Sequence, residues 1–231
     1  MLTIEKTVLP STEQWEVVIE GMRNPLNSWD KMDSKRCTAH TYCSECLAYK
    51  GGDIDGCQLE GIDPYIIGKN DHKLMMSLNK GGTEHSKYRR MIPVWVTINA
   101  PLYWWKEADT YTIGKVQNSC STMHKIHAKE FTLDDFSYEH LYPYEECILL
   151  KIIDCLNFAR KDFLDSKDKD DWWQMIQLLP TSYNQKRTVF LNYEVLAKMY
   201  RERKNHKLDE WHTLCDWIKT LPYSELITME E

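Results

Sequence analysis

Hydrophobic and polar positions alternate at the start of the chain and then change to a helical period. Residues 2–8 (LTIEKTV) show the two-residue alternation that is typical of a β-strand. The next stretch, EQWEVVIEGM, has apolar residues at helical spacing, and Ser11 or Thr12 is suited to cap its first turn. The pattern therefore predicts a strand followed by a helix.

Strand and helix patterns continue to alternate along the rest of the chain, and Gly or Pro stands at several of the boundaries between them. Gly81 follows a helical stretch as a C-cap residue, and Pro101 stands in the predicted first turn of another helix. Asn192 is suited to cap a helix that ends near Arg203. Two further strands are predicted, over residues 92–100 and 183–191. Helices are predicted over residues 71–79, from 101, over 144–163, 172–179 and 193–203, and from 209.

The longest predicted helix carries an apolar stripe, which predicts that it packs in the core. The stripe contains Ile148, Ile152, Cys155, Leu156, Ala159 and Phe163. Interleaved strands and helices predict an α/β (α+β) protein, with a single domain over residues 1–231.

Residues 23–62 show no sustained hydrophobic period, which predicts an irregular, Cys-rich insertion at about residues 30–62. Cys43 and Cys46 have the spacing of two ligands in a tetrahedral zinc site, and Cys37 and Cys57 would complete the set. Free thiols are an equally good interpretation, because the spacing is looser than in a paired CxxC arrangement.

Composition narrows the class of protein. The 231 residues are 42% hydrophobic, which is ample for a buried core, and the apolar stretches are too short to span a membrane. The N-terminus has no signal-peptide pattern, so we expect a cytoplasmic location. A net charge of -6 argues against a broad nucleic-acid surface, although a local basic pocket is compatible with it.

Arg203 shares a helical face with Asn192, Leu196 and Met199, so an arginine is aligned with an apolar stripe. A guanidinium in that place can make bidentate contacts to a phosphate. The alternative is that Arg203 and its cationic neighbours complement the dipole at the helix C-terminus.

Residues 118–127 (NSCSTMHKIH) read as a polar loop whose hydroxyl and amide groups, including Ser121, are suited to bind an anion. A structural turn is an equally good interpretation. Cys120 with His124 as its base would be a nucleophile, but the sequence offers no third group to orient the pair.

These parts occur in the order found in one family. GGTEH at residues 81–85 precedes the strand over residues 92–100, and the loop at Asn118 follows a helix. Leu179-Pro180 then leads into a strand, Asn192 and Arg203. From residue 81 to residue 217 the chain resembles the flavin-dependent thymidylate synthases.

The resemblance departs at three basic positions. Thr110-Tyr111-Thr112 stands where the family has Arg-His-Arg, Met123-His124 stands where the loop has Arg-Tyr, and Ile176 replaces an arginine. Substitute cations are available in the sequence at Lys106, Lys115, Lys125, Lys186 and Arg187.

The resemblance implies a central, mostly antiparallel sheet flanked by helices, and a homotetramer with nucleotide sites between subunits. It implies reductive methylation of dUMP to dTMP, with FAD, NADPH and methylene folate. Arg203 and Ser121 would act in catalysis; Asn118, Ser121, Arg203 and Arg187 would bind the nucleotide; Tyr111, His85 and Asn192 would bind the cofactor. The alternatives are modification of another pyrimidine nucleotide, a non-catalytic nucleotide-binding protein, and a zinc-stabilised interaction protein on the same scaffold.

Overall fold

The computed structural model describes residues 1–36 and 65–229, which form two compact units. Unit 1 comprises Met1–Lys6, Thr97–Thr112 and Gln117–Val189, and unit 2 comprises the described parts of Thr7–Val96, Ile113–Val116 and Phe190–Glu231. That the whole chain is a single domain stays a prediction.

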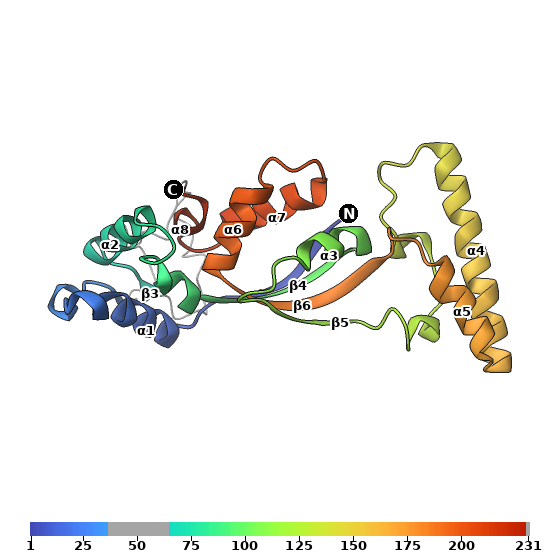
Figure 1. Ribbon diagram of the computed structural model, residues 1–231, viewed down its shortest axis with the longest axis horizontal. Coiled ribbons are helices and arrows are strands. Elements are labelled where there is room, and N and C mark those ends of the chain that lie inside the picture. The colour runs from blue at the N-terminus through green and yellow to red at the C-terminus, as the bar shows by residue number, and fades with distance from the viewer. Residues whose placement is uncertain (37–64, 230–231) are drawn as a thin grey trace, which may run out of the picture. The chain divides into compact units, whose positions relative to one another are not determined.

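Four strands form one antiparallel sheet in the order β1-β4-β6-β5 (Figure 1). Their bounds are Thr3–Val8 for β1, Pro93–Pro101 for β4, Val116–Ser119 for β5 and Asn184–Asn192 for β6. The α+β class and the three predicted strands are confirmed. The strand β5 was not predicted, because three of its four residues are exposed and give it no apolar face.

In unit 1 the helices α4 (Pro143–Ser166) and α5 (Lys169–Leu178) pack against each other. The predicted core face of α4 is partly wrong. Leu149 and Ile153 are buried with Leu156 and Ala159, whereas Ile148 is 41% exposed and Cys155 is also exposed. Ile152 and Phe163 of the predicted stripe are partly buried against the same core, so the pattern located the buried side only in part.

The helix α3 (Leu102–Ala108) also lies in unit 1, and it begins one residue later than predicted. Pro101 is its N-cap residue rather than part of its first turn. The N–H groups of Leu102 and Tyr103 donate to the carbonyl oxygens of Tyr183 and Thr181, both at 3.0 Å, so the segment before β6 fixes where α3 starts.

Unit 2 is mainly helical, with α1 (Thr12–Arg23), α2 (Lys69–Lys80), α6 (Tyr193–Arg203), α7 (Asp209–Thr220) and α8 (Glu225–Thr228). The predicted caps are confirmed: Ser11 forms a capping box with Gln14, and Gly81 ends α2. Trp15, Ile19, Met75, Leu196 and Trp211 are among the buried side chains of this unit.

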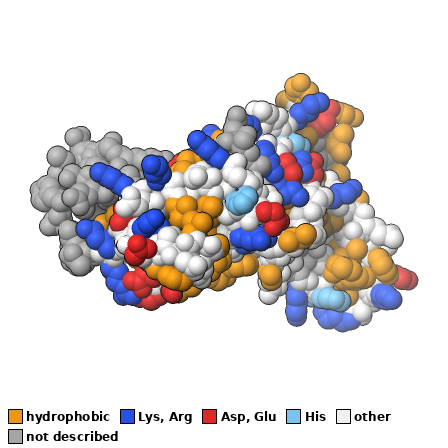
Figure 2. Space-filling model, turned by 60° about the vertical axis from the view of Figure 1, so that its left-hand side comes forward, with side chains coloured by type: hydrophobic (Ala, Val, Ile, Leu, Met, Phe, Trp, Pro, Cys, Tyr) orange, Lys and Arg blue, Asp and Glu red, His pale blue; other side chains and the backbone are white. Residues whose placement is uncertain are grey.

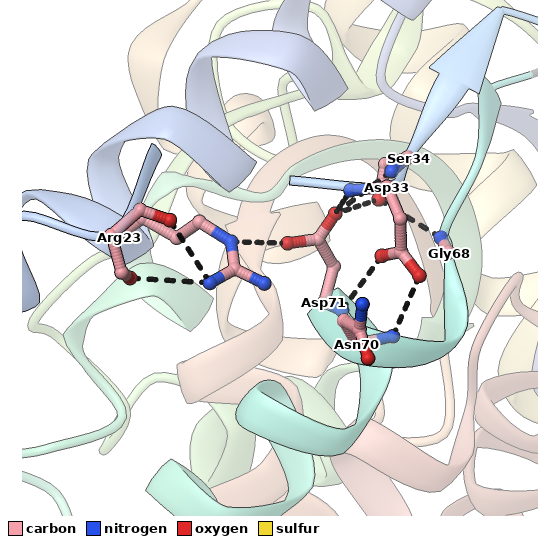
Figure 3. Close-up of polar contacts among 7 residues, drawn as sticks. Arg23, Asp33, Ser34, Gly68, Asn70 and Asp71 are labelled. Atoms are coloured by element: carbon pink, nitrogen blue, oxygen red, sulfur yellow. Dashed lines mark hydrogen bonds and ion pairs between the residues drawn. The ribbon is translucent and has the colours of Figure 1, made fainter. Parts of the chain in front are cut away.

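A buried ion pair fastens the two described segments on either side of residues 37–64 (Figure 3). Arg23 Nε lies 2.5 Å from Asp71 Oδ1, and the two side chains are 4% and 0% exposed. The second oxygen of Asp71 accepts hydrogen bonds from the Asp33 and Ser34 N–H groups and from Ser34 Oγ. Asp33 in turn accepts from the N–H groups of Asn70 and Asp71 in the first turn of α2.

Next to this network, β2 (Lys35–Arg36) pairs antiparallel with β3 (Tyr65–Ile66), and Arg36 lies opposite Tyr65. We call the network and this strand pair the clasp. The four predicted zinc ligands, Cys37, Cys43, Cys46 and Cys57, lie outside the described residues.

The described residues include no helix that is long and apolar enough to cross a membrane. They also include no group of three or more His, Cys, Asp or Glu side chains placed to hold a metal ion.

Candidate functional site

In unit 1, the candidate Arg187 projects from β6 and is held by partners from β6 and from the end of α3. Its Nε donates to Gln185 Oε1 at 2.9 Å, and its Nη1 donates to both carboxylate oxygens of Asp109, at 2.8 and 3.1 Å. The guanidinium carbon lies 4.3 Å from the ring centroid of Trp105. Arg187 is therefore a fixed, oriented cation.

The Arg187 guanidinium keeps one group available. Within the described residues its Nη2 has no hydrogen-bond partner, and its side chain is 11% exposed. Asp109 is 42% exposed, so a carboxylate occupies the position from which an anion would approach Nη1. A phosphate could bind through Nη2 directly or displace Asp109, because guanidinium groups bind both kinds of anion in the same planar manner.

The loop after β5 is attached to the same strand. Cys120 N–H donates to the Lys186 carbonyl at 2.9 Å, and Gln185 Nε2 donates to the Cys120 carbonyl at 2.9 Å. Ser121 is exposed, and its Oγ accepts from the N–H groups of Met123 and Lys125 at 3.3 and 3.2 Å. Its hydroxyl proton is left to donate to a ligand. Asn118 is exposed on β5.

Cys120 is exposed, and no hydrogen bond joins it to His124 in the part of the chain that the structure describes. Nothing in this geometry supports a Cys-His nucleophile.

In unit 2, Asn192 caps α6, because its Oδ1 accepts from the Val195 N–H at 3.0 Å. The predicted cap is therefore confirmed, and Asn192 is only 7% exposed. Gly114 approaches it closely: a Cβ on Gly114, whose φ is +77°, would lie 2.9 Å from Asn192 Nδ2. This close approach leaves room only for glycine.

Arg203 ends α6 and is half-buried, with its guanidinium carbon 4.8 Å from the ring centroid of Trp211. The His206 ring lies 6.2 Å from the same indole. Stacking on an indole face orients an arginine while leaving its edge for other contacts. His85, the other candidate of unit 2, is exposed and packs against Gly81 at the end of α2.

The predicted site residues thus divide between the two units. Tyr111, Asn118, Ser121 and Arg187 belong to unit 1, and His85, Asn192 and Arg203 belong to unit 2. Sequence reasoning missed Trp105, Asp109 and Gln185, which hold Arg187. The alternating pattern of β6 was the available signal, since it places Gln185 on the same strand face as Arg187.

The Thr110-Tyr111-Thr112 segment offers no cation to the phosphates of a flavin dinucleotide. Thr110 Oγ1 donates to the Glu107 carbonyl at 2.7 Å, and Tyr111 is 5% exposed. The three residues carry no cation, and their aromatic ring belongs to the core of unit 1.

The strand order and the helices around the sheet define the class of fold to which the chain belongs: it has the fold of the flavin-dependent thymidylate synthases. Two structures of thymidylate synthase X (ThyX) from Helicobacter pylori, each with FAD and dUMP, match with TM-scores of 0.59 and 0.60 at 14% and 13% identity. Both matches cover 99% of this chain and 96% or 97% of the other.

A UMP/dUMP methylase, PolB from Streptomyces cacaoi, bound with 5-Br UMP, matches with a TM-score of 0.50 at 13% identity, over 70% of this chain and 84% of its own. No protein-family model and no curated protein matches the sequence. At such identities these matches describe the fold of this chain.

Proposed function

We propose that this chain binds a pyrimidine nucleotide on a ThyX-like scaffold, with dUMP as the first ligand to test. The observation that carries the proposal is the helix α6, which begins at the Asn192 cap and ends at Arg203 stacked on Trp211. This unit has the order that the resemblance requires, on a fold shared with proteins solved with dUMP or 5-Br UMP.

Each unit offers its own group of candidate residues for the nucleotide phosphate, and the two groups are separate candidates. Arg187, Ser121 and Asn118 form the group in unit 1, where the guanidinium and the hydroxyl supply donors for a phosphate. Arg203 forms the group in unit 2. Arg187 and Arg203 can each be replaced alone, so the two groups can be tested independently.

The proposed nucleotide binding has two versions, one with catalytic activity and one without. The catalytic version is reductive methylation of dUMP to dTMP, with FAD, NADPH and methylene folate in a homotetramer, and with His85, Asn192 and Tyr111 at the cofactor. The second version is a nucleotide-binding protein without that activity. The lack of a cation at Thr110-Tyr111-Thr112 and the burial of Tyr111 favour the second version.

The first experiment is calorimetric titration of dUMP into the wild-type chain and into Arg203→Ala and Arg187→Ala. Loss of one charge-assisted phosphate contact, about 1.5 to 3 kcal/mol, predicts a Kd raised roughly 10- to 150-fold. Arg201→Ala is the matched control, because Arg201 is an exposed arginine on the same helix. Equal affinity in all four proteins, or no dUMP binding by the wild type, would refute the assignment.

A second measurement separates the two versions. The visible spectrum is recorded after FAD is added and excess is removed, with and without dUMP. Absorbance equivalent to about one bound flavin per chain, with bands that shift when dUMP is added, supports the catalytic version. A colourless protein that still binds dUMP supports the nucleotide-binding protein without catalytic activity.

A further inference from the structure

Within the part of the chain that the structure describes, several cations of unit 1 form no ion pair with a carboxylate, unlike Lys129, Lys186 and Arg187 of the same unit. On the face drawn in Figure 2, lysine and arginine side chains lie beside aspartate and glutamate side chains. Pairs such as Lys186 with Glu5, at 2.7 Å, are of this kind. Among the described residues, Lys125, Arg160 and Lys167 form no ion pair.

The first two cations are brought together by η4 (Ile126–Ala128), a short turn after the Ser121 loop. Ile126 is 3% exposed and anchors this turn in the core of unit 1. Arg160 of α4 donates from Nε to the carbonyl oxygen of His127 at 3.0 Å. Lys125 directly precedes the turn, and its N–H donates to Ser121 Oγ. The backbone at this point is therefore fixed from two sides.

The third cation reaches the same place from the end of α4. The His127 ring lies 4.8 Å from the ring of Phe163, and Lys167 Nζ lies 5.8 Å from that same ring. Lys167 has a φ of +58° and closes α4 through its N–H, which donates to the Phe163 carbonyl. The charges of Lys125, Lys167 and Arg160, from the loop and from the end and body of one helix, all act on the His127 imidazole.

His127 Nδ1 is buried and has no hydrogen-bond partner among the described residues. An unpaired buried polar atom of this kind costs free energy and calls for an explanation. Burial first, and then Lys125, Lys167 and Arg160, lower the pKa of His127. The imidazole is therefore neutral near pH 7 and presents one N–H donor among three positive charges.

Among the described residues, no nearby carboxylate forms an ion pair with these three cations, although the carboxylates keep their charge. Asp168 accepts from the Asp170 N–H in the cap of α5, and Asp171 accepts from Ser166 Oγ. Asp162 and Asp165 follow Arg160 by two and five residues, which at about 100° per residue places both on the far side of α4.

We propose that Lys125, Arg160 and Lys167, with the His127 imidazole, form a binding site for a phosphate group, either as a diphosphate or as a phosphate monoester. Arg160 keeps its terminal nitrogens for a planar, two-point contact, and the lysines supply mobile charges. This site shares no side chain with the proposed nucleotide site, so it does not depend on that function.

The test is an NMR titration of the whole protein that follows the His127 ring signals while inorganic phosphate, pyrophosphate or dUMP is added. We expect pyrophosphate to bind more tightly than phosphate, because it carries more charge. Binding should also raise the pKa of His127, since an anion beside the ring stabilises the imidazolium form.

Two variants and one control define the outcome. Arg160→Gln and Lys167→Asn should each raise the pyrophosphate Kd roughly tenfold. Asn tolerates the positive φ of position 167, so this variant folds even if Arg160→Gln disturbs the η4 turn. Lys161→Gln removes the same charge from the next residue of α4 and should leave the Kd unchanged.

The dUMP arm identifies the source of the phosphate. A His127 shift with dUMP that is lost in Lys167→Asn assigns the site to a nucleotide phosphate, and a shift with phosphate or pyrophosphate alone assigns it to a free anion. If no ligand moves the His127 signals up to roughly 10 mM, or if Lys167→Asn binds like the wild type, the site does not exist.

Discussion

Asp71 illustrates at the residue scale how much one buried carboxylate can stabilise. It accepts hydrogen bonds from Ser34 and from the Arg23 guanidinium, and no part of its side chain is exposed. Asp71→Asn leaves Arg23 as a buried charge without its counter-ion, so we expect a loss of about 3 to 5 kcal/mol in the free energy of unfolding. Urea unfolding measures this loss of stability. The control is Asp216→Asn, which removes an exposed pair with Lys219 and should lower the free energy of unfolding by less than about 1 kcal/mol.

The same carboxylate predicts a pH dependence. Burial alone would raise the pKa of Asp71, but the hydrogen bonds from Ser34, Arg23 and the Asp33 and Ser34 N–H groups outweigh it and lower the pKa below its ordinary 3.8. Its contribution is therefore fully present above pH 3.8 and is lost as the pH falls through the lower folded-state value. The stability gap between the wild type and Asp71→Asn should narrow below pH 4; a constant gap contradicts this assignment.

Asp109 tests whether Arg187 is a ligand residue or only a structural one. If the carboxylate competes with an incoming phosphate, Asp109→Asn should lower the Kd for dUMP by roughly three- to tenfold, because a neutral amide holds Nη1 less strongly and no longer repels the phosphate. Calorimetry checks this, with Asp216→Asn as a control for the change in net charge. Weaker binding by Asp109→Asn would show that the pair with Asp109 positions Arg187 for the ligand.

At the scale of elements, α4 has a second apolar face in addition to the buried one. Tyr144 is 73% exposed, Ile148 is 41% exposed and Phe158 is 68% exposed, and helical spacing places them on one side with Cys155. The resemblance implies a homotetramer, for which this face is a candidate contact between copies.

We therefore expect Ile148→Asp with Phe158→Lys to reduce the mass of the protein in light scattering after gel filtration, because buried apolar area drives association. Leu150→Lys is the control, since Leu150 is also 41% exposed but lies on another side of α4. A monomeric wild type, or an unchanged mass in the double variant, would remove this face from consideration.

Caps and strands were predictable because their signals are local. Ser11, Gly81 and Asn192 act on backbone groups within a few residues, so the sequence places them correctly. Two partners of Arg187 were not predictable: Asp109 lies 78 residues away in sequence, and the Trp105 indole donates to the Gln185 carbonyl across 80 residues. Such contacts depend on how β6 meets α3. The buried side of α4 was predicted only in part, with Leu156 and Ala159 right and Ile148 and Cys155 wrong, because both of its faces are apolar.

At the scale of the whole molecule, the cysteine prediction is open to a direct test. If Cys37, Cys43, Cys46 and Cys57 bind zinc, the purified chain should contain about one zinc ion, as a four-thiolate site requires. Mass spectrometry of the metal content should show its loss in Cys43→Ser with Cys46→Ser. Cys120→Ser, at an exposed cysteine, should retain it. A wild-type protein without zinc would support free thiols.

The clasp has a consequence for how this protein can be altered. Because Arg36 and Tyr65 are paired residues of neighbouring strands, the ends of the two described segments on either side of residues 37–64 lie next to each other. A domain whose own termini lie close together could be grafted there without pulling α2 away from Asp33, at a cost set mainly by loop closure. The position is thus suited to carry a fluorescent domain that labels the intact protein.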